Sequence, residues 1–194
     1  FRVPKDITYR GSNGRVSAYA WNDVAPAAFG SVAGLVLAGT AAGVEADATG
    51  PQIELTFVGR PQFTSGDAIP PDAVLRATIA DPGGINVTGE TGHEIQLTVD
   101  GEVAAVTESF VADGDYRTGH LDRQLSGLEP GTHLIRLKAW DCFNNSAEVE
   151  VSARVSDRAE VILTELLFHP NPLTGGGGHF TFAVAAPAIR ARVQ

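Results

Sequence analysis

Cysteine and basic residues are scarce in this chain of 194 residues. The single cysteine, Cys142, excludes an internal disulfide bond and a thiolate zinc cluster. Lysine and arginine number 14 against 23 aspartates and glutamates, which leaves a net charge of −9, and they form no basic run. Because nucleic-acid binding requires a basic stripe, this balance argues against a nucleic-acid partner. A hydrophobic content of 43% indicates a folded chain rather than a disordered one.

Methionine is absent and the chain begins at Phe1, so we expect a piece of a longer protein. Charge is missing from residues 24–44, which match the length of about 20 residues that a helix needs to cross a bilayer. The stretch is rich in glycine and alanine, and the acidic residues Asp23 and Glu45 flank it. We therefore predict no membrane span, but a loop followed by a short buried strand at 31–38.

A sustained helical repeat is also missing. Several segments instead alternate apolar and polar residues with a period of two: 15–21, 52–57, 74–80, 94–100, 133–140 and 147–155. Turn signals rich in glycine, proline, asparagine and aspartate separate them, among them 81–84, 100–101 and 130–131. Short strands at this spacing predict an all-β fold, an immunoglobulin-like β-sandwich.

Polar connectors at 45–51 and 155–159 divide the chain. Between them, residues 50–157 have the length of about 100 residues that an immunoglobulin-like sandwich uses. We expect residues 1–49 to be the last strands of a preceding β domain. Residues 158–194 then form the incomplete start of a C-terminal sorting-type β domain, with a flexible glycine-rich loop at 175–178.

Several sequence motifs occur in a recognisable order: FRVPKDITY (1–9), GRVSAYAWND (14–23), DPGGINVTGETGHEI (81–95), LSGLEPGTHLIRLKAWDCFNNS (125–146) and FHPNP (168–172). In this order they resemble the region that follows the catalytic domain in gingipain-type cysteine peptidases, above all the cell-surface sortases of the type IX (Por) secretion system. The resemblance implies that the catalytic cysteine and histidine lie upstream of Phe1. We therefore expect this fragment to be non-catalytic and to act as a structural or docking region of a peptidase.

The resemblance also implies partners and a location. The partners are the catalytic domain of the same chain and proteins of the secretion system, and the location is extracytoplasmic, at the outer-membrane surface or secreted. Pro170, Asn171 and Pro172 resemble the opening of the sorting domain that type IX cargo carries. The same three residues also suit a simple turn that ends a strand at 161–168, because proline fixes φ and asparagine initiates an Asx turn. Both interpretations stay open at this point.

Candidate catalytic residues are few. Cys142 would need a base within hydrogen-bonding reach, and His133 is the nearest histidine in the sequence. The two residues flank one strand, which would separate them by about 30 Å. The five histidines, 93, 120, 133, 169 and 179, show no zinc-ligand spacing. We therefore predict no catalytic residue, no cofactor-binding residue and no zinc site.

Carboxylates suggest calcium as the one metal to consider. Asp113 and Asp115 share one loop, and Asp141 precedes Asn144 and Asn145. These aspartates supply only two or three of the six to eight oxygens that calcium takes. A structural role for Asp141 explains the pattern better, because its carboxylate is placed to accept hydrogen bonds from the backbone of the turn that contains Asn144 and Asn145.

An alternative function is carbohydrate binding or adhesion within a secreted protein. Aromatic residues such as Trp21 and Trp140 are suited to stacking on sugars. Trp140, however, is expected on the same strand face as Arg136 and Lys138, covered by their aliphatic stems. This alternative therefore rests on the fold class and on no motif.

Overall fold

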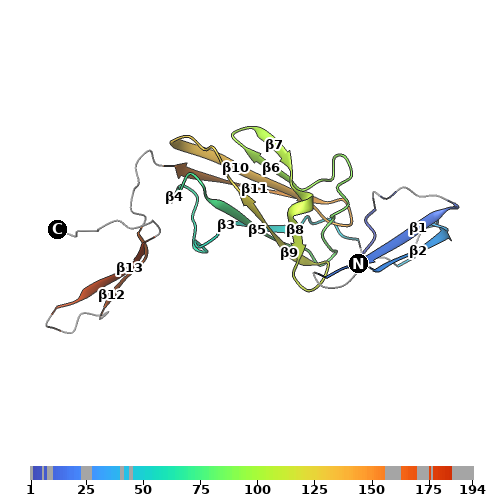
Figure 1. The fold of residues 1–194 in the computed structure, drawn as a ribbon, viewed down its shortest axis with the longest axis horizontal. Helices are drawn as coiled ribbons and strands as arrows, with labels where there is room; N and C mark the ends of the chain where they lie inside the picture. Colours follow the sequence, from blue (N-terminus) through green and yellow to red (C-terminus); the bar gives the residue numbers. More distant parts are fainter. Residues whose placement is uncertain are drawn as a thin grey trace.

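Strands of alternating polarity form two facing sheets at the centre of the molecule (Figure 1). The computed structural model describes residues 2–5, 7, 11–22, 28–39, 42–43, 46–155, 163–169, 175 and 177–184. In these residues the elements are β1 (Gly14–Ala20), β2 (Ala28–Leu35), β3 (Gln52–Phe57), β4 (Ala68–Ile69), β5 (Val74–Ala80), β6 (Gln96–Val99), β7 (Glu102–Ala105), η1 (Thr107–Ser109), β8 (Phe110–Ala112), β9 (Thr118–Gln124), β10 (Gly131–Trp140), β11 (Ser146–Val155), β12 (Leu163–His169) and β13 (His179–Val184). Apart from the one-turn 3-10 helix η1, the described residues form no helix.

The central sandwich consists of a five-stranded and a four-stranded sheet. The first has the order β4-β11-β10-β6-β7 and the second β3-β5-β9-β8. All neighbouring strands in the two sheets are antiparallel except β4, which pairs in parallel with the end of β11. The all-β sandwich predicted from the sequence is confirmed.

The core lies between the two sheets and follows the period of two. Alternate residues of the inner strands β5 and β10 are fully buried: Leu75, Ala77, Ile79, Ile135, Leu137 and Ala139. Ile69, Ile95 and Leu121 close the same core from neighbouring elements. Each large aliphatic side chain buried in this way stabilises the fold by about 1.5–3 kcal/mol. The sandwich therefore has a hydrophobic core of its own.

The longest pairing joins β10 to β11 in one unbroken register, from Gly131 opposite Val155 to Trp140 opposite Ser146. The turn between them, residues 141–145, contains Asn144 with a φ of 68°. Asparagine tolerates this left-handed conformation better than most residues. The turn leaves the sandwich at the end nearest β1 and β2 (Figure 1).

Two hairpins lie at opposite ends of the sandwich (Figure 1). At one end β1 pairs with β2, and at the other β12 pairs with β13. The buried strand expected at 31–38 is wrong, because β2 begins at Ala28 and all of its residues are exposed. No helix among the described residues combines the length and the apolar character required to cross a membrane.

Candidate functional site at the junction before the sandwich

The turn at 81–86 and the turn at 141–145 lie against each other at one end of the sandwich. The Cys142 N–H donates to the Gly84 carbonyl at 2.8 Å, and the Asn86 N–H donates to the Trp140 carbonyl at 2.9 Å. Ile85 and Asp141 form an isolated antiparallel bridge. Backbone hydrogen bonds thus join the two turns into one unit, although their residues are far apart in the sequence.

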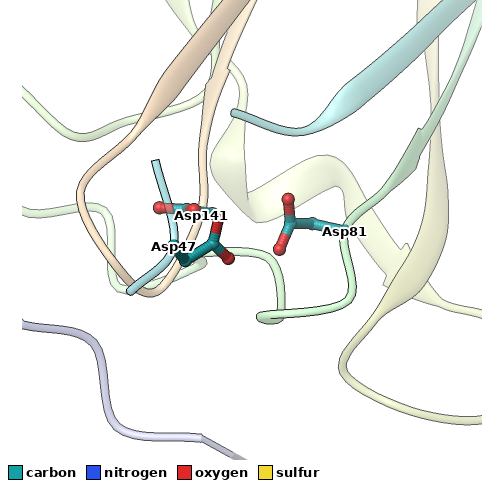
Figure 2. A group of neighbouring side chains, drawn as sticks. All are labelled: Asp47, Asp81 and Asp141. Atoms are coloured by element: carbon teal, nitrogen blue, oxygen red, sulfur yellow. The ribbon is translucent and has the colours of Figure 1, made fainter. Parts of the chain in front are cut away.

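Three aspartates converge inside this unit (Figure 2). Asp47, Asp81 and Asp141 each place a carboxylate oxygen within 4.8 Å of those of the other two. Asp141 is completely buried and Asp81 is only 3% exposed. Burying carboxylates this close together is costly unless hydrogen bonds, a proton or a cation offset their repulsion. The hydrogen bonds of each aspartate show how this cost is met.

Asp141 is held by three donors from its own turn. Its Oδ1 accepts hydrogen bonds from the backbone N–H groups of Phe143 at 2.8 Å and Asn145 at 2.7 Å. Its Oδ2 accepts from the Asn145 side-chain amide at 2.7 Å. The Asn144 N–H donates to the Asp141 carbonyl at 3.4 Å. The carboxylate therefore closes the turn from inside.

Asp81 closes the other turn less completely. Its Oδ1 accepts a short hydrogen bond of 2.6 Å from the Gly83 N–H. Burial raises the pKa of Asp81, and the neighbouring carboxylates of Asp141 and Asp47 raise it further, against the opposing effect of the Gly83 hydrogen bond. Burial beside two other carboxylates thus favours the neutral form of Asp81.

Glycine is required where the two turns meet. A Cβ atom on Gly83 would lie 2.8 Å from Oδ2 of Asp47 and 2.9 Å from the Phe143 ring. Gly84 has a φ of +96°, and a Cβ atom there would lie 2.5 Å from the Tyr116 ring. The double glycine after Pro82 thus allows the backbone to approach the carboxylates closely.

Asp47 comes from the connector that precedes the sandwich. Its Oδ1 accepts hydrogen bonds from the backbone and the hydroxyl of Thr49, both at 3.1 Å. Its carbonyl oxygen accepts from the Asn145 side chain at 3.2 Å. Gly50 follows so closely against β11 that a Cβ atom would lie 2.4 Å from the backbone of Ser146. The connector is therefore fixed to the 141–145 turn.

The first residues of the chain bind both turns. The Lys5 N–H donates to the Cys142 carbonyl at 3.0 Å, and Arg2 Nη1 donates to the Gly83 carbonyl at 3.2 Å. The Arg2 guanidinium lies 4.1 Å from the centroid of the Phe143 ring, and the Lys5 ammonium lies 4.6 Å from it. Phe143 is thus a platform for two cations from the segment before β1.

The three aspartates considered as calcium ligands do not form one group in the structure. The structure groups Asp141 with Asp47 and Asp81, and not with Asp113 and Asp115. Asp113 pairs with His120 at 2.8 Å, and Asp115 accepts from the Arg117 N–H at 2.8 Å. Asp47 and Asp81 were missed as companions of Asp141. The polar connector around Asp47 and the Asp-Pro-Gly-Gly turn that begins at Asp81 were the available signals.

Cys142 and His133 are separately engaged. Cys142 is buried, and its thiol lies 3.6 Å from the Ile85 carbonyl and 3.9 Å from the Arg2 carbonyl. His133 is bonded through Nδ1 to Asp100 at 2.6 Å and through Nε2 to the Glu129 carbonyl at 2.6 Å. The thiol thus serves packing within the junction, whereas the histidine joins a strand to a loop.

The aromatic residues considered for sugar binding differ in exposure. The Lys138 ammonium lies 4.7 Å from the centroid of the Trp140 ring, and the His93 ring packs against it at 4.5 Å. This arrangement leaves Trp140 poorly suited to stack on a sugar. Trp21, in contrast, is 79% exposed beyond the end of β1. Pro170, Asn171 and Pro172 lie outside the described residues.

Comparisons with known proteins show one solved structure that is similar over most of the chain. No family model matches the sequence, and no curated protein matches it. Among solved structures the chain is similar to dimeric latent PorU from Porphyromonas gingivalis, with 32% sequence identity over 88% of this chain and a TM-score of 0.56. The chain spans 16% of the PorU chain.

A second solved structure shows a weaker likeness. It is an endo-β-1,4-mannanase from Thermotoga petrophila, with 14% identity over 55% of this chain and 20% of that chain, and a TM-score of 0.37. A TM-score of 0.37 is too low to define a shared fold.

Proposed function

We propose that this chain is a non-catalytic, immunoglobulin-like region of a surface or secreted cysteine peptidase of the gingipain type, namely a type IX secretion sortase. Its role is to hold neighbouring parts of the parent protein in a fixed arrangement and to dock them. The similarity to PorU over 88% of the chain supports this proposal, and so does the sequence motif order. The chain spans 16% of PorU, and in this proposal the peptidase activity belongs to other parts of such a parent.

The attachment of the amino-terminal segment to the sandwich is the observation that carries the proposal. Arg2, Lys5 and Asp47 all bind the turns at 81–86 and 141–145. The segments FRVPK, DPGGIN and KAWDCFNNS, which carry the family resemblance, meet at this junction. In our proposal the junction fixes the sandwich relative to the domain that precedes it.

The proposed division of the chain follows the sheets. Residues 50–157 are the sandwich, residues 1–49 end a preceding β domain, and residues 158–194 begin a sorting-type domain. The hairpin β1–β2 supports this division, because Val16, Tyr19, Phe29 and Val32 are all more than half exposed. A two-stranded sheet with so many exposed apolar residues is only marginally stable alone, so further strands are expected to cover it. We further propose that the parent protein is extracytoplasmic, and that this region contacts the catalytic domain of the same chain and proteins of the secretion system.

Replacing Phe143 by alanine tests the junction. The variant loses both cation–π contacts, each of which contributes about 0.5–1 kcal/mol at a partly exposed site. The population of molecules with a detached amino-terminal segment should rise about fivefold or more, because about 1 kcal/mol corresponds to that factor. Amide hydrogen exchange at Lys5, whose N–H is bonded to Cys142, measures this population.

Val103→Ala is the matched control, because Val103 is exposed on β7 and takes no part in the junction. The Phe143 variant should also lower the attachment of cargo to the cell surface when it is introduced into the full-length parent. Unchanged exchange at Lys5 together with unchanged cargo attachment would refute the docking role.

The non-catalytic assignment has its own test. The isolated chain should hydrolyse no peptide substrate, and Cys142→Ser should change neither this result nor the fold. The physical reason is that the thiol faces two carbonyl oxygens inside the junction, and a carbonyl cannot act as a base. Peptidase assays with and without a thiol reagent provide the measurement. Thiol-dependent hydrolysis that disappears in Cys142→Ser would overturn the assignment.

A further inference from the structure

Two histidines face each other across the hairpin of β12 and β13. His169 is the last residue of β12 and His179 the first of β13, and the antiparallel register places them directly opposite each other. Their ring centroids are 5.9 Å apart, with 32° between the ring planes. Both residues are exposed. The pair therefore presents two imidazoles on the same side of the hairpin, open to solvent.

The neighbouring pair fixes this register. Phe168 and Phe180 also lie opposite each other, with ring centroids 4.9 Å apart. Successive strand residues point to opposite faces, so the phenylalanines occupy one face and the histidines the other. A Cβ atom on Gly178 would overlap the Phe168 ring and lie 3.0 Å from the His169 carbonyl, so a larger residue there would displace the ring. The packing of the aromatic pair thus holds the histidines together.

We propose that His169 and His179 bind one divalent transition-metal ion, of which zinc, nickel and copper are the candidates, through one ring nitrogen each. Imidazole suits these metals, whereas calcium and magnesium prefer oxygen. Two imidazoles on one tetrahedral ion, at metal–nitrogen distances of about 2.0–2.1 Å, have ring centroids about 5 Å apart. The observed 5.9 Å approaches that separation, and a small rotation of the side chains closes the difference.

The chemistry of such a site follows from its two protein ligands. Water or another ligand completes the coordination of the ion, so the site is open and its affinity is lower than that of a closed four-ligand site. Because one ligand comes from each strand, the bound ion links the end of β12 to the start of β13. By mass action, an ion that binds only the paired strands stabilises their pairing.

Sequence spacing gave no indication of this site, since the two histidines are separated by residues 170–178. Metal-ligand motifs on one helix or one loop depend on short spacings, whereas a cross-strand pair depends on the register of two strands. The structure supplies that register, and the proposed site departs from the expectation of no zinc site, which rested on spacing alone.

Calorimetric titration of the untagged chain with zinc chloride, and separately with nickel chloride, tests the proposal. The wild type should bind one ion per chain, and X-ray absorption of the zinc complex should show two imidazole nitrogens at about 2.0 Å. His169→Ala and His179→Ala should each lower the affinity at least about tenfold, since changes even to residues that only orient metal ligands cost 10–100-fold. Zinc should also slow amide exchange in β12 and β13 of the wild type.

His120→Ala is the matched control, because His120 is a histidine of β9 that pairs with Asp113 outside the hairpin. It should bind zinc as the wild type does. Both hairpin histidines are exposed, so their replacement should leave the melting temperature of the sandwich unchanged. Absence of zinc and nickel binding to the wild type would overturn the proposal. Binding that survives in the double variant His169→Ala/His179→Ala would also overturn it.

Discussion

Asp141→Ala should lower the free energy of unfolding by at least about 3 kcal/mol. The substitution leaves three hydrogen-bond donors from Phe143 and Asn145 without their acceptor, and each unsatisfied buried group costs about 1–3 kcal/mol. Asp141 is completely buried, so water cannot replace the carboxylate without reorganising the turn. Chemical denaturation followed by circular dichroism provides the measurement.

Asp113→Ala is the control for this experiment. Its side chain is 48% exposed and is paired with His120 at the surface. Loss of a surface pair changes stability by well under about 1 kcal/mol. If Asp113→Ala destabilises the chain as much as Asp141→Ala does, the stability of the sandwich does not depend on the hydrogen bonds that the Asp141 carboxylate accepts in the 141–145 turn.

Calcium at Asp47, Asp81 and Asp141 is the competing explanation for the carboxylate group. Most of the oxygens of these three carboxylates already accept hydrogen bonds within the chain, which leaves few of them for an ion. Burial and the two neighbouring carboxylates raise the pKa of Asp81, so its charge is costly in the folded state. In the presence of a chelator at neutral pH, Asp81→Asn should therefore raise the melting temperature, because it removes one charge and keeps the acceptor for Gly83. Calcium should leave the wild-type midpoint unchanged. A rise of many degrees with calcium that Asp81→Asn abolishes would establish a cation site.

Stability should fall as the pH rises from mildly acidic to alkaline, because His133 loses a proton. Its ring nitrogens face Asp100 and the Glu129 carbonyl, so it makes both hydrogen bonds as a donor only when charged. Asp100 raises the pKa of His133 chiefly through this hydrogen bond, against the opposing effect of burial.

The sign follows from the direction of the shift. A raised pKa in the folded state means that the contribution is fully present below the ordinary pKa of histidine, about 6.5. It disappears as the pH rises through the higher folded value. The hydrogen bond from His133 lowers the pKa of Asp100. Asp100 therefore contributes fully to stability only at pH values above the ordinary pKa of aspartate. The Asp100–His133 pair thus stabilises the fold most at pH values between the ordinary pKa of aspartate and that of histidine.

Asp100→Asn isolates this effect. Asparagine can still accept the hydrogen bond that the Leu134 N–H donates to Oδ1 at 2.8 Å, but it carries no charge. Denaturation curves between mildly acidic and alkaline pH should show a smaller decline in the variant than in the wild type. Equal declines in both proteins would mean that Asp100 and His133 are not the origin of the pH dependence.

The strands that could be predicted from the sequence are those with one face in the core. In β5, β10 and β11 alternate residues are buried or more buried than their neighbours, and the matching alternation is visible in the sequence. The prediction missed β7, whose residues are all exposed, and β9, in which only Gly119 and Leu121 are buried. Strands at a sheet edge, or with few buried apolar residues, carry little periodic signal because pairing with a neighbour, and not burial, makes them strands.

The same distinction applies to the sites. Sequence alone determined the all-β class and the placing of Asp141 at a turn, because alternation and turn closure depend on residues only two to four positions apart. Tertiary structure decided that Asp47 and Asp81 join Asp141, that Arg2 and Lys5 bind Phe143, and that His169 faces His179. These contacts join distant parts of the chain through strand register and packing between turns, and no local pattern encodes either of them.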